Sequence, residues 1–505
     1  MRRLRVAVFA YVVVLAVIAT VRWHLWTFGA DTGTFAQAIA DAFGGFRDGP
    51  EQGTHFRFHW APILVLLMPL VVVTRSPLSL QFAQIALIAS TAFPLYAIAR
   101  RYTSEVRAGS YATIALAYPP LIAVAFAEFH EIAFYPVVAL GLIWAADASR
   151  WRWFAVFALA AVTIREEACL IFAVVGFALA ALGAFATRGN AATPARRPSP
   201  RARGLLLGEP DQPRALAVAG VMLAVASIAA LVTYTGLVLP RIGAWQPMHF
   251  YEYPFATGPR NVLLALLLHP AYIATFLNVG RLTYVLEAFV PLALLPFRSR
   301  WSLLALPGLA IVLLSSEPIA WRMGSHYAAI FAPWLLLGSV AALIALGDAR
   351  REGDRFALRS TFALCAIFSI FFNPTHVLHY LKPVYPTGDA WAALASLPPD
   401  VTVATHDEWY TQIAAREPGA TIFYCPYVRY AVYASDFPSR SYRDEIVPLL
   451  EADLADGRAR AIAHFGRVTV YRRTPPPGAR PIDCIRSGDL RYRLPATTVI
   501  RDAGT

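Results

Sequence analysis

The sequence predicts a mainly α-helical, polytopic membrane protein with a small α/β domain at its C-terminal end. The 505 residues are 57% hydrophobic and only 15% charged, whereas soluble domains contain about a quarter charged residues. Long apolar runs, separated by short charged segments, continue to residue 372, and beyond it the hydrophobicity falls. We therefore expect a membrane domain, residues 1–372, followed by an extracytoplasmic α/β domain, residues 373–505.

The N-terminal apolar run is expected to be a retained first span. It follows Met1-Arg-Arg-Leu-Arg5 and extends to Val21, which is longer than the apolar core of about 7–15 residues in a secretory signal peptide. Arg22-Trp23-His24 is also a poor cleavage site. The N-terminus should accordingly lie in the cytoplasm.

The later apolar runs set the expected number of crossings, because about 20 apolar residues span a bilayer. Residues 61–73 are too short and too proline-rich to cross, so they favour a helix in the outer interface. The other expected spans are residues 81–99, 108–126, 132–146, 154–164, 168–185, 215–238, 281–297, 303–314, 328–346 and 362–372. With the first span they give about eleven crossings.

The loops between these runs separate by charge, which predicts the topology. Arginines gather in one set of loops, whereas histidines, tyrosines and carboxylates gather in the other. The positive-inside rule places the arginine-rich loops in the cytoplasm, including a mobile linker at residues 188–214. Residues 23–60 and 240–280 are then outer loops. The net charge of +12 comes with a single lysine and no basic stripe, so no nucleic-acid partner is expected.

The C-terminal region has the pattern of a small α/β domain. Short strands are expected at residues 400–405, 421–424 and 468–471, and helices at residues 409–416 and 442–454. Thr405-His406-Asp407 follows the first strand, where α/β folds often contact ligands, but a solvated loop is favoured. Cys425 and Cys484 pair if this domain is extracytoplasmic; Cys169 and Cys365 lie in apolar runs and are expected in the core.

Four polar clusters are expected at the same outer surface, which favours a functional site over isolated structural roles. Each cluster also has a structural interpretation. Asp31 could cap a helix beginning near Thr34, His130 or His326 could bind a carbonyl at the interface, and a glutamate could neutralise Arg165. The clusters are Asp31 with His55 and His59; Glu128, His130 and Glu131; Arg165, Glu166 and Glu167; and Arg322, His326 and Tyr327.

The residue types in these clusters suit transfer chemistry at a phosphate-bearing substrate. A carboxylate can remove a proton from an acceptor hydroxyl, and arginines and histidines can hold a phosphate as it departs. Tyr251 and Glu252, in the second outer loop, could contact a sugar, although such aromatics more often anchor a protein at the interface. The histidines lack the close spacing of a metal site, so no metal cofactor is expected, although the sequence does not exclude a divalent ion.

Five short motifs resemble those of an uncharacterised bacterial membrane-protein family, domain of unknown function 2079. They are GADTGTFAQAI, HFRFHWAPILVLLMPL, EFHEIAFYPVVAL, TIREEACLIF and SHYAAIFAPWLLL, in this order. The resemblance covers roughly residues 28–346. The family in turn resembles the type-C glycosyltransferase superfamily (GT-C), whose members transfer sugars from polyprenyl phosphates.

The resemblance implies a GT-C-like bundle in which Asp31, at the end of the first span, is the catalytic base. A second acidic residue in the next outer loop corresponds to Glu128 or Glu131. The family pattern has Asp-Phe-His where this chain begins with Glu128, and Lys-Glu-Asp where it has Arg165-Glu166-Glu167. These departures conserve charge, and leave open which carboxylate matters.

The implied reaction moves a sugar from a polyprenyl-phosphate donor to a lipid, glycan or protein acceptor outside the bacterial inner membrane. The expected donor phosphate ligands are Arg165, Arg322, His326 and His59. The expected substrate contacts are His55, His130, Glu166, Glu167, Tyr327, Tyr251 and Glu252. The alternatives are a lipid or polyprenol-phosphate transporter, which should show repeated halves or broken helices at the midplane, and a scaffold that binds a partner through its C-terminal domain.

Overall fold

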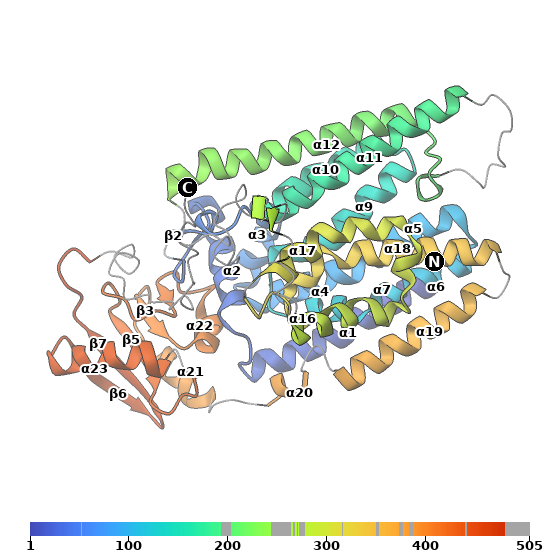
Figure 1. Ribbon diagram of the computed structural model, residues 1–505. Coiled ribbons are helices and arrows are strands. Elements are labelled where there is room, and N and C mark those ends of the chain that lie inside the picture. Colours follow the sequence, from blue (N-terminus) through green and yellow to red (C-terminus); the bar gives the residue numbers. More distant parts are fainter. Residues whose placement is uncertain are drawn as a thin grey trace.

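A helical bundle carries a small sheet domain at one end, and the N-terminus lies at the opposite end (Figure 1). The computed structural model describes residues 1–51, 53–192, 204–243, 264–265, 268–269, 271, 278–315, 317–349, 353–372, 377–382, 387–439 and 442–479. Tyr251 and Glu252 therefore lie outside the described residues, as do most of the second outer loop and Cys484. Cys425 is disulfide-bonded, whereas Cys169 and Cys365 are free and buried.

The bundle is built from apolar helices of very different lengths. In its first half these are α1 (Arg2–His24), α3 (Met68–Thr74), α4 (Leu78–Ser90), α5 (Ala92–Tyr102), α6 (Glu105–Ala112), α7 (Ile114–Ala117), α8 (Pro119–Phe126) and α9 (Tyr135–Asp147). In its second half they are α10 (Trp151–Ile164), α11 (Glu166–Ala192), α12 (Pro213–Thr233), α13 (Leu239–Ile242), α16 (Val279–Phe289), α17 (Leu306–Leu314), α18 (Ala332–Ala349) and α19 (Gly353–Ile367).

The expected number of about eleven spans is not confirmed. Among the described residues, four helices are long and apolar enough to cross a membrane, or five if the pair around Pro119, bent by 53°, counts as one span. Prolines at the first turns of α8, α9 and α17 explain part of the difference. Proline lacks an N–H and clashes with the preceding turn, so helices restart there and the apolar runs are divided into shorter elements.

Ion pairs join helix ends at the end of the bundle that holds the N-terminus. Arg101 contacts Asp147 at 3.0 Å, and Arg107 contacts Asp354 at 3.3 Å.

The segment expected to be a mobile linker, residues 188–214, is partly structured. Residues up to 192 continue α11, and Leu205–Leu207 form a turn whose first two side chains are buried. The Leu205 N–H donates to Asp147 at 2.8 Å, which fixes this turn against the bundle.

The C-terminal domain is an α/β unit, as expected, but its sheet is larger than the sequence indicated. Its strands are β3 (Val403–Thr405), β4 (Ala420–Thr421), β5 (Tyr430–Ala434), β6 (Ala459–Phe465) and β7 (Val468–Arg473), in the order β4-β3-β5-β7-β6. β3 is parallel to β4 and β5, whereas β7 is antiparallel to β5 and β6. Its helices are α20 (Val377–Tyr380), α21 (Thr387–Ala395), α22 (Asp407–Ile413) and α23 (Val447–Ala455).

The segment after β3 is not the solvated loop that the sequence favoured. His406 is 3% exposed and stacks on Phe437 at 3.6 Å between ring centroids. Its Nε2 accepts a hydrogen bond from the Ala434 N–H at 3.1 Å. A neutral imidazole therefore joins β3 to β5 inside the domain, and α22 begins immediately after it.

Helix α22 attaches this domain to α2 (Ala30–Ala40), which lies in the segment expected to form the first outer loop (Figure 1). The Thr411 hydroxyl donates to the Gly29 carbonyl at 2.5 Å, and the Tyr410 hydroxyl donates to Gln37 at 2.9 Å. Two polar side chains of α22 thus bond to both ends of α2, so the C-terminal domain determines where α2 lies.

Candidate functional site

Asp31 lies in the first turn of α2. The sequence indicated a turn here, with Asp31 as a possible cap of a helix near Thr34. The helix instead begins at Ala30. Its N-cap residue is Gly29, which has no side chain that could cap the helix. The capping interpretation of Asp31 is therefore wrong, and its side chain is 63% exposed.

Glu128 provides the acceptors that the start of α2 needs. Its carboxylate accepts from the Gly29 N–H at 2.7 Å and from the Thr32 N–H at 3.3 Å. The first N–H groups of a helix have no partner within it, and its N-terminus favours negative charge. Glu128 is thus committed to holding α2, and with it Asp31, in place.

Two glutamines of α4 hold the turn that carries Glu128 and His130. Gln84 donates to the Glu128 carbonyl at 3.1 Å and accepts from the His130 N–H at 3.0 Å. Gln81 donates to the Ala125 carbonyl at 2.8 Å. Both amides are buried, and they satisfy backbone groups left without helical partners after α8 ends.

His130 links Asp31 to the segment before α18. Its Nε2 lies 3.5 Å from the Asp31 carboxylate, and its Nδ1 lies 3.1 Å from the Glu128 carbonyl. Its ring stacks on that of His326 at 3.4 Å between centroids, with 20° between the planes. His326 in turn contacts the Tyr327 ring. Two of the four clusters therefore meet at a single pair of imidazoles.

Arg165 forms a buried charge network between α10 and α11, at the break that the sequence predicted. The guanidinium is 1% exposed and pairs with Glu167 at 2.8 Å and with Glu131 at 3.3 Å. It also lies 3.0 Å from Nε2 of His59. Two carboxylates already balance the charge of Arg165.

Glu166 joins this network to the end of the first outer loop. It lies 2.8 Å from Nδ1 of His59 and accepts from the Trp60 N–H at 2.9 Å. Because Glu166 is the first residue of α11, these contacts fix the loop to the helix end. His59 thus lies between Glu166 and Arg165.

Burial and neighbouring carboxylates raise the pKa values around Asp31. Burial of its surroundings, then Asp407 and Glu131, raises the pKa of Asp31 to about 6. Burial raises the pKa of Glu128 to about 7, and desolvation by the surrounding chain, together with the charge of Glu128, raises the pKa of Asp407 to about 6. Burial also lowers the pKa of His130 to about 4. Near neutral pH, Asp31 is therefore mostly ionised and its histidine neighbour is neutral.

Asp407 is a member of this site that the sequence analysis noted after the first strand of the C-terminal domain but assigned to a solvated loop. It is exposed in the first turn of α22 and belongs to the C-terminal domain, and it acts electrostatically on both Asp31 and Glu128. Its position directly after a buried strand was the only available signal. Gln84 and Gln81 were missed, although two amides within an apolar run indicate buried hydrogen bonding.

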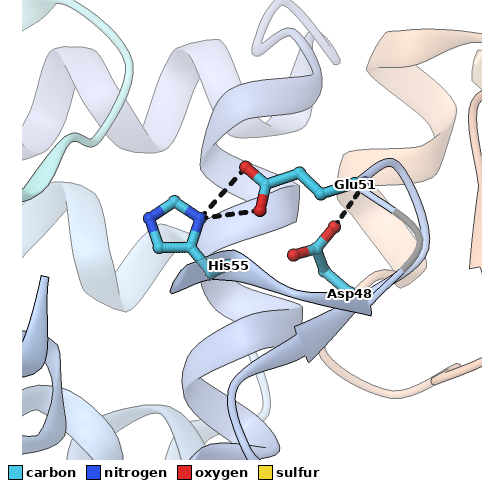
Figure 2. A group of neighbouring side chains, drawn as sticks. All are labelled: Asp48, Glu51 and His55. Carbon is cyan, nitrogen blue, oxygen red and sulfur yellow. Dashed lines mark hydrogen bonds and ion pairs between the residues drawn. The ribbon is translucent and has the colours of Figure 1, made fainter. Parts of the chain in front are cut away.

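Among the residues that the structure describes, two groups of side chains have donor sets that could hold a metal ion. His59, Glu166 and Glu167 form one group, and Asp48, Glu51 and His55 form the other (Figure 2). His55 lies near the first group, at 5.9 Å from the His59 ring, and its Nδ1 faces Glu51 at 2.9 Å. Asp48 and Glu51 were missed because the spacing of the histidines in the sequence did not indicate a metal site.

The structure brings together most of the residues that the sequence singled out. Arg322 is exposed, and the described residues show no contact between its side chain and the network. Tyr251 and Glu252 fall outside the described chain. The expected residues with contacts in the network are Asp31, His55, His59, Glu128, His130, Glu131, Arg165, Glu166, Glu167, His326 and Tyr327.

The fold and the site define a mostly helical membrane protein whose candidate site includes α2, the helix on which α22 of the sheet domain packs (Figure 1). The chain belongs to the DUF2079 family of predicted membrane proteins, whose family model matches residues 21–420.

The chain also shows low-level similarity to solved membrane enzymes. It is similar to ArnT from Cupriavidus metallidurans bound to undecaprenyl phosphate, with 15% identity, a TM-score of 0.48, and coverage of 92% of this chain and 98% of that one. It is similar to the archaeal oligosaccharyltransferase AglB from Archaeoglobus fulgidus, in complex with an inhibitory peptide and a dolichol-phosphate, with 11% identity, a TM-score of 0.38 and coverage of 86% and 70%. A comparison with curated proteins finds no match.

Proposed function

We propose that this protein is a membrane glycosyltransferase that moves a sugar from a polyprenyl phosphate to an extracytoplasmic acceptor, with Asp31 as the general base. One observation carries the assignment of the base. Among the three acidic candidates, Glu131 is buried against Arg165 and Glu128 is bonded to the start of α2, whereas the Asp31 side chain is 63% exposed. Asp31 is therefore the carboxylate that a substrate hydroxyl can reach.

The electrostatics around Asp31 suit proton removal near neutral pH. A base is most effective when its pKa lies near the working pH, and the pKa of Asp31 is raised to about 6. His130 stabilises the protonated form of Asp31. Its Nδ1 faces a backbone carbonyl and therefore carries the imidazole proton, which leaves the lone pair of Nε2 directed toward Asp31. A proton taken by Asp31 can then be shared with that nitrogen.

The proposed reaction is a single displacement. The acceptor oxygen forms a bond to the anomeric carbon as the bond from that carbon to the phosphate oxygen breaks. The acceptor proton goes to Asp31, the polyprenyl phosphate leaves with the bonding electrons, and the configuration at the sugar carbon inverts. No oxidant or reductant is needed.

Arg322 is the proposed donor phosphate ligand, with Arg165 acting at longer range. Arg165 already pairs with Glu131 and Glu167, so a phosphate would have to displace a carboxylate to bind it directly. Arg322 is exposed, four positions before His326, which stacks on His130. A lipid tail among the apolar helices would bring a phosphate head group to this end of the bundle.

The proposed setting is the bacterial inner membrane, with the sheet domain outside the cytoplasm. The arginine pairs with Asp147 and Asp354 lie at the bundle end that holds the N-terminus, and the sheet domain lies at the opposite end (Figure 1). This arrangement supports a cytoplasmic N-terminus under the positive-inside rule.

Proteoliposomes containing the purified protein test the proposal with radiolabelled sugars linked to polyprenyl phosphate. We expect label to pass covalently to an acceptor offered from the side of the C-terminal domain, and we expect Arg322→Gln to raise KM for the donor more than it lowers kcat. Movement of the intact labelled lipid across the bilayer, without covalent transfer to any acceptor tried, would instead indicate a transporter and contradict the proposal.

A further inference from the structure

A short hairpin in the first outer loop brings two carboxylates and an imidazole together (Figure 2). Its strands are β1 (Arg47–Asp48) and β2 (Gly53–Thr54), which pair antiparallel. Asp48 ends the first strand, Glu51 lies in the turn, and His55 follows the second strand. The Glu51 N–H donates to Oδ1 of Asp48 at 2.7 Å, so the turn is held in the conformation that gathers the three side chains.

The three ligand atoms have a separation close to that of a coordinated metal. One atom from each residue lies within 4.8 Å of the other two. Metal–ligand bonds of about 2.1 Å place ligand atoms roughly 3–3.5 Å apart, a distance that small side-chain rotations would reach. His55 already has its Nδ1 2.9 Å from the nearer oxygen of Glu51.

The group is buried and one of its acceptors has no hydrogen-bond partner. Asp48 is 6% exposed and His55 is 1% exposed. Oδ2 of Asp48 has no hydrogen-bond partner among the described residues and, in Figure 2, lies on the side of the carboxylate nearer His55. Burying a carboxylate oxygen without a partner is costly, so this oxygen points to a missing ligand.

We propose that Asp48, Glu51 and His55 bind one divalent metal ion of the kind that accepts mixed nitrogen and oxygen ligands, Zn²⁺ or Mn²⁺. Imidazole suits transition metals better than Mg²⁺ or Ca²⁺, and carboxylates suit both classes. The inference rests on the hairpin alone and does not depend on the proposed transferase activity.

The two carboxyl groups of the hairpin can also be accommodated without a metal ion. Burial, together with the neighbouring Glu51, raises the pKa of Asp48, and burial raises the pKa of Glu51 to about 8. A proton shared between the two carboxyls is the competing state, and metal retention by the protein distinguishes the two.

The second group with a suitable donor set is less favourable for a cation. Arg165 lies 2.8 Å from Glu167 and 3.0 Å from His59. A metal ion held by those two residues would therefore face a guanidinium at close range, with repulsion between like charges. The hairpin group has no arginine ion pair among the described residues.

The proposed metal site lies between two features of the molecule. Asp48 also lines a cavity of about 1080 Å³, whose other lining residues include Gln37 of α2 and Thr402 of the C-terminal domain. On the opposite side, His55 contacts the Phe35 ring at 4.9 Å, and that ring contacts His130 at 5.3 Å. A metal would fix the hairpin beside the Asp31 helix and would be reachable from the cavity.

Metal retention by the full-length protein tests this inference. The protein, freed of any purification tag, is treated with EDTA, incubated with Zn²⁺ or Mn²⁺ and desalted, and bound metal is measured by mass spectrometry alongside thermal unfolding. We expect wild type to retain one equivalent of one of these ions and to gain thermal stability. His55→Gln and Asp48→Asn should weaken retention by about tenfold or more.

Two variants make the test decisive. Asp48→Asn keeps an oxygen for the Glu51 N–H, so it should fold in EDTA with a Tm at or above that of wild type. Asp41→Asn is the matched control, because that carboxylate pairs with Arg47 at 2.9 Å outside the group, and it should retain metal like wild type. The inference would be overturned if wild-type protein retained neither metal ion and gained no thermal stability from either. It would also be overturned if Asp48→Asn retained as much metal as wild type. A proton shared between the two carboxyl groups would then be the explanation.

Discussion

Substituting Gly33 by alanine tests whether the C-terminal domain positions α2 as the structure indicates. A Cβ at Gly33 would lie 2.8 Å from both Oγ1 of Thr411 and Cε1 of Tyr410, and 2.9 Å from Cα of Thr411. A side-chain rotation cannot relieve the last contact, because that atom belongs to the backbone. Helix α22 must therefore move away from α2.

The expected cost follows from these contacts. Overpacking costs about 1–3 kcal/mol, and the hydrogen bonds of Thr411 and Tyr410 to α2 contribute about 1 kcal/mol each when they are lost. The better helix propensity of alanine offsets about 1 kcal/mol. The net prediction is a loss of about 2–4 kcal/mol in the free energy of unfolding, with the domain interface opening first.

Thermal unfolding in detergent and limited proteolysis of the C-terminal domain measure this effect. Gly109→Ala is the control, because a Cβ at that position would have nothing within 4 Å of it, and it should stabilise α6 by about 0.5–1 kcal/mol. If Gly33→Ala unfolds at the wild-type temperature and its C-terminal domain is cleaved no faster, the proposed role of α22 in holding α2 is refuted.

Three further predictions concern the charges of the site. Glu131→Gln should destabilise the protein by about 3 kcal/mol. This is the lower end of the range for a broken buried ion pair, because Glu167 still balances the charge of Arg165. Thermal unfolding measures the loss, and a loss no larger than that of the exposed Glu105→Gln variant would contradict the buried pairing. The rate of sugar transfer should fall about tenfold per pH unit below about pH 6, since Asp31, with its pKa raised to about 6, is then protonated; a pH–rate profile that is flat down to pH 5 would argue against Asp31 as the base. Asp407→Asn should move this acidic limb to lower pH, because it removes a negative charge that raises the pKa of Asp31; an unmoved limb would show that Asp407 does not act on the base.

The sequence predicted those parts of the fold that depend on local composition. The break at Arg165 was found because three charged residues interrupt an apolar run, and the chain does pass from α10 to α11 there. β6 was missed because most of its side chains are exposed, so the strand has no apolar run to reveal it. The division of spans depends on tertiary packing around prolines, which hydrophobicity alone does not describe.

The site was predictable where its residues stand at ends of apolar runs. Asp31, His130 and Arg165 were found this way, because ionisable groups at a membrane surface are costly unless they are used. The division of labour between the carboxylates was not predictable, since the contacts of Glu128 with Gly29 and of Glu131 with Arg165 join distant segments. Asp407 belongs to another domain, and only the docking of α22 on α2 brings it near.

The central claim is that Asp31 removes the acceptor proton, and Asp31→Asn tests it most directly. The amide keeps the size of the side chain, and the carboxylate makes no capping bond to α2, so the variant should fold with wild-type stability. Its kcat for sugar transfer in proteoliposomes should fall by about 10²–10⁴, with little change in KM for the donor. A folded Asp31→Asn protein that transfers sugar at the wild-type rate would contradict the account.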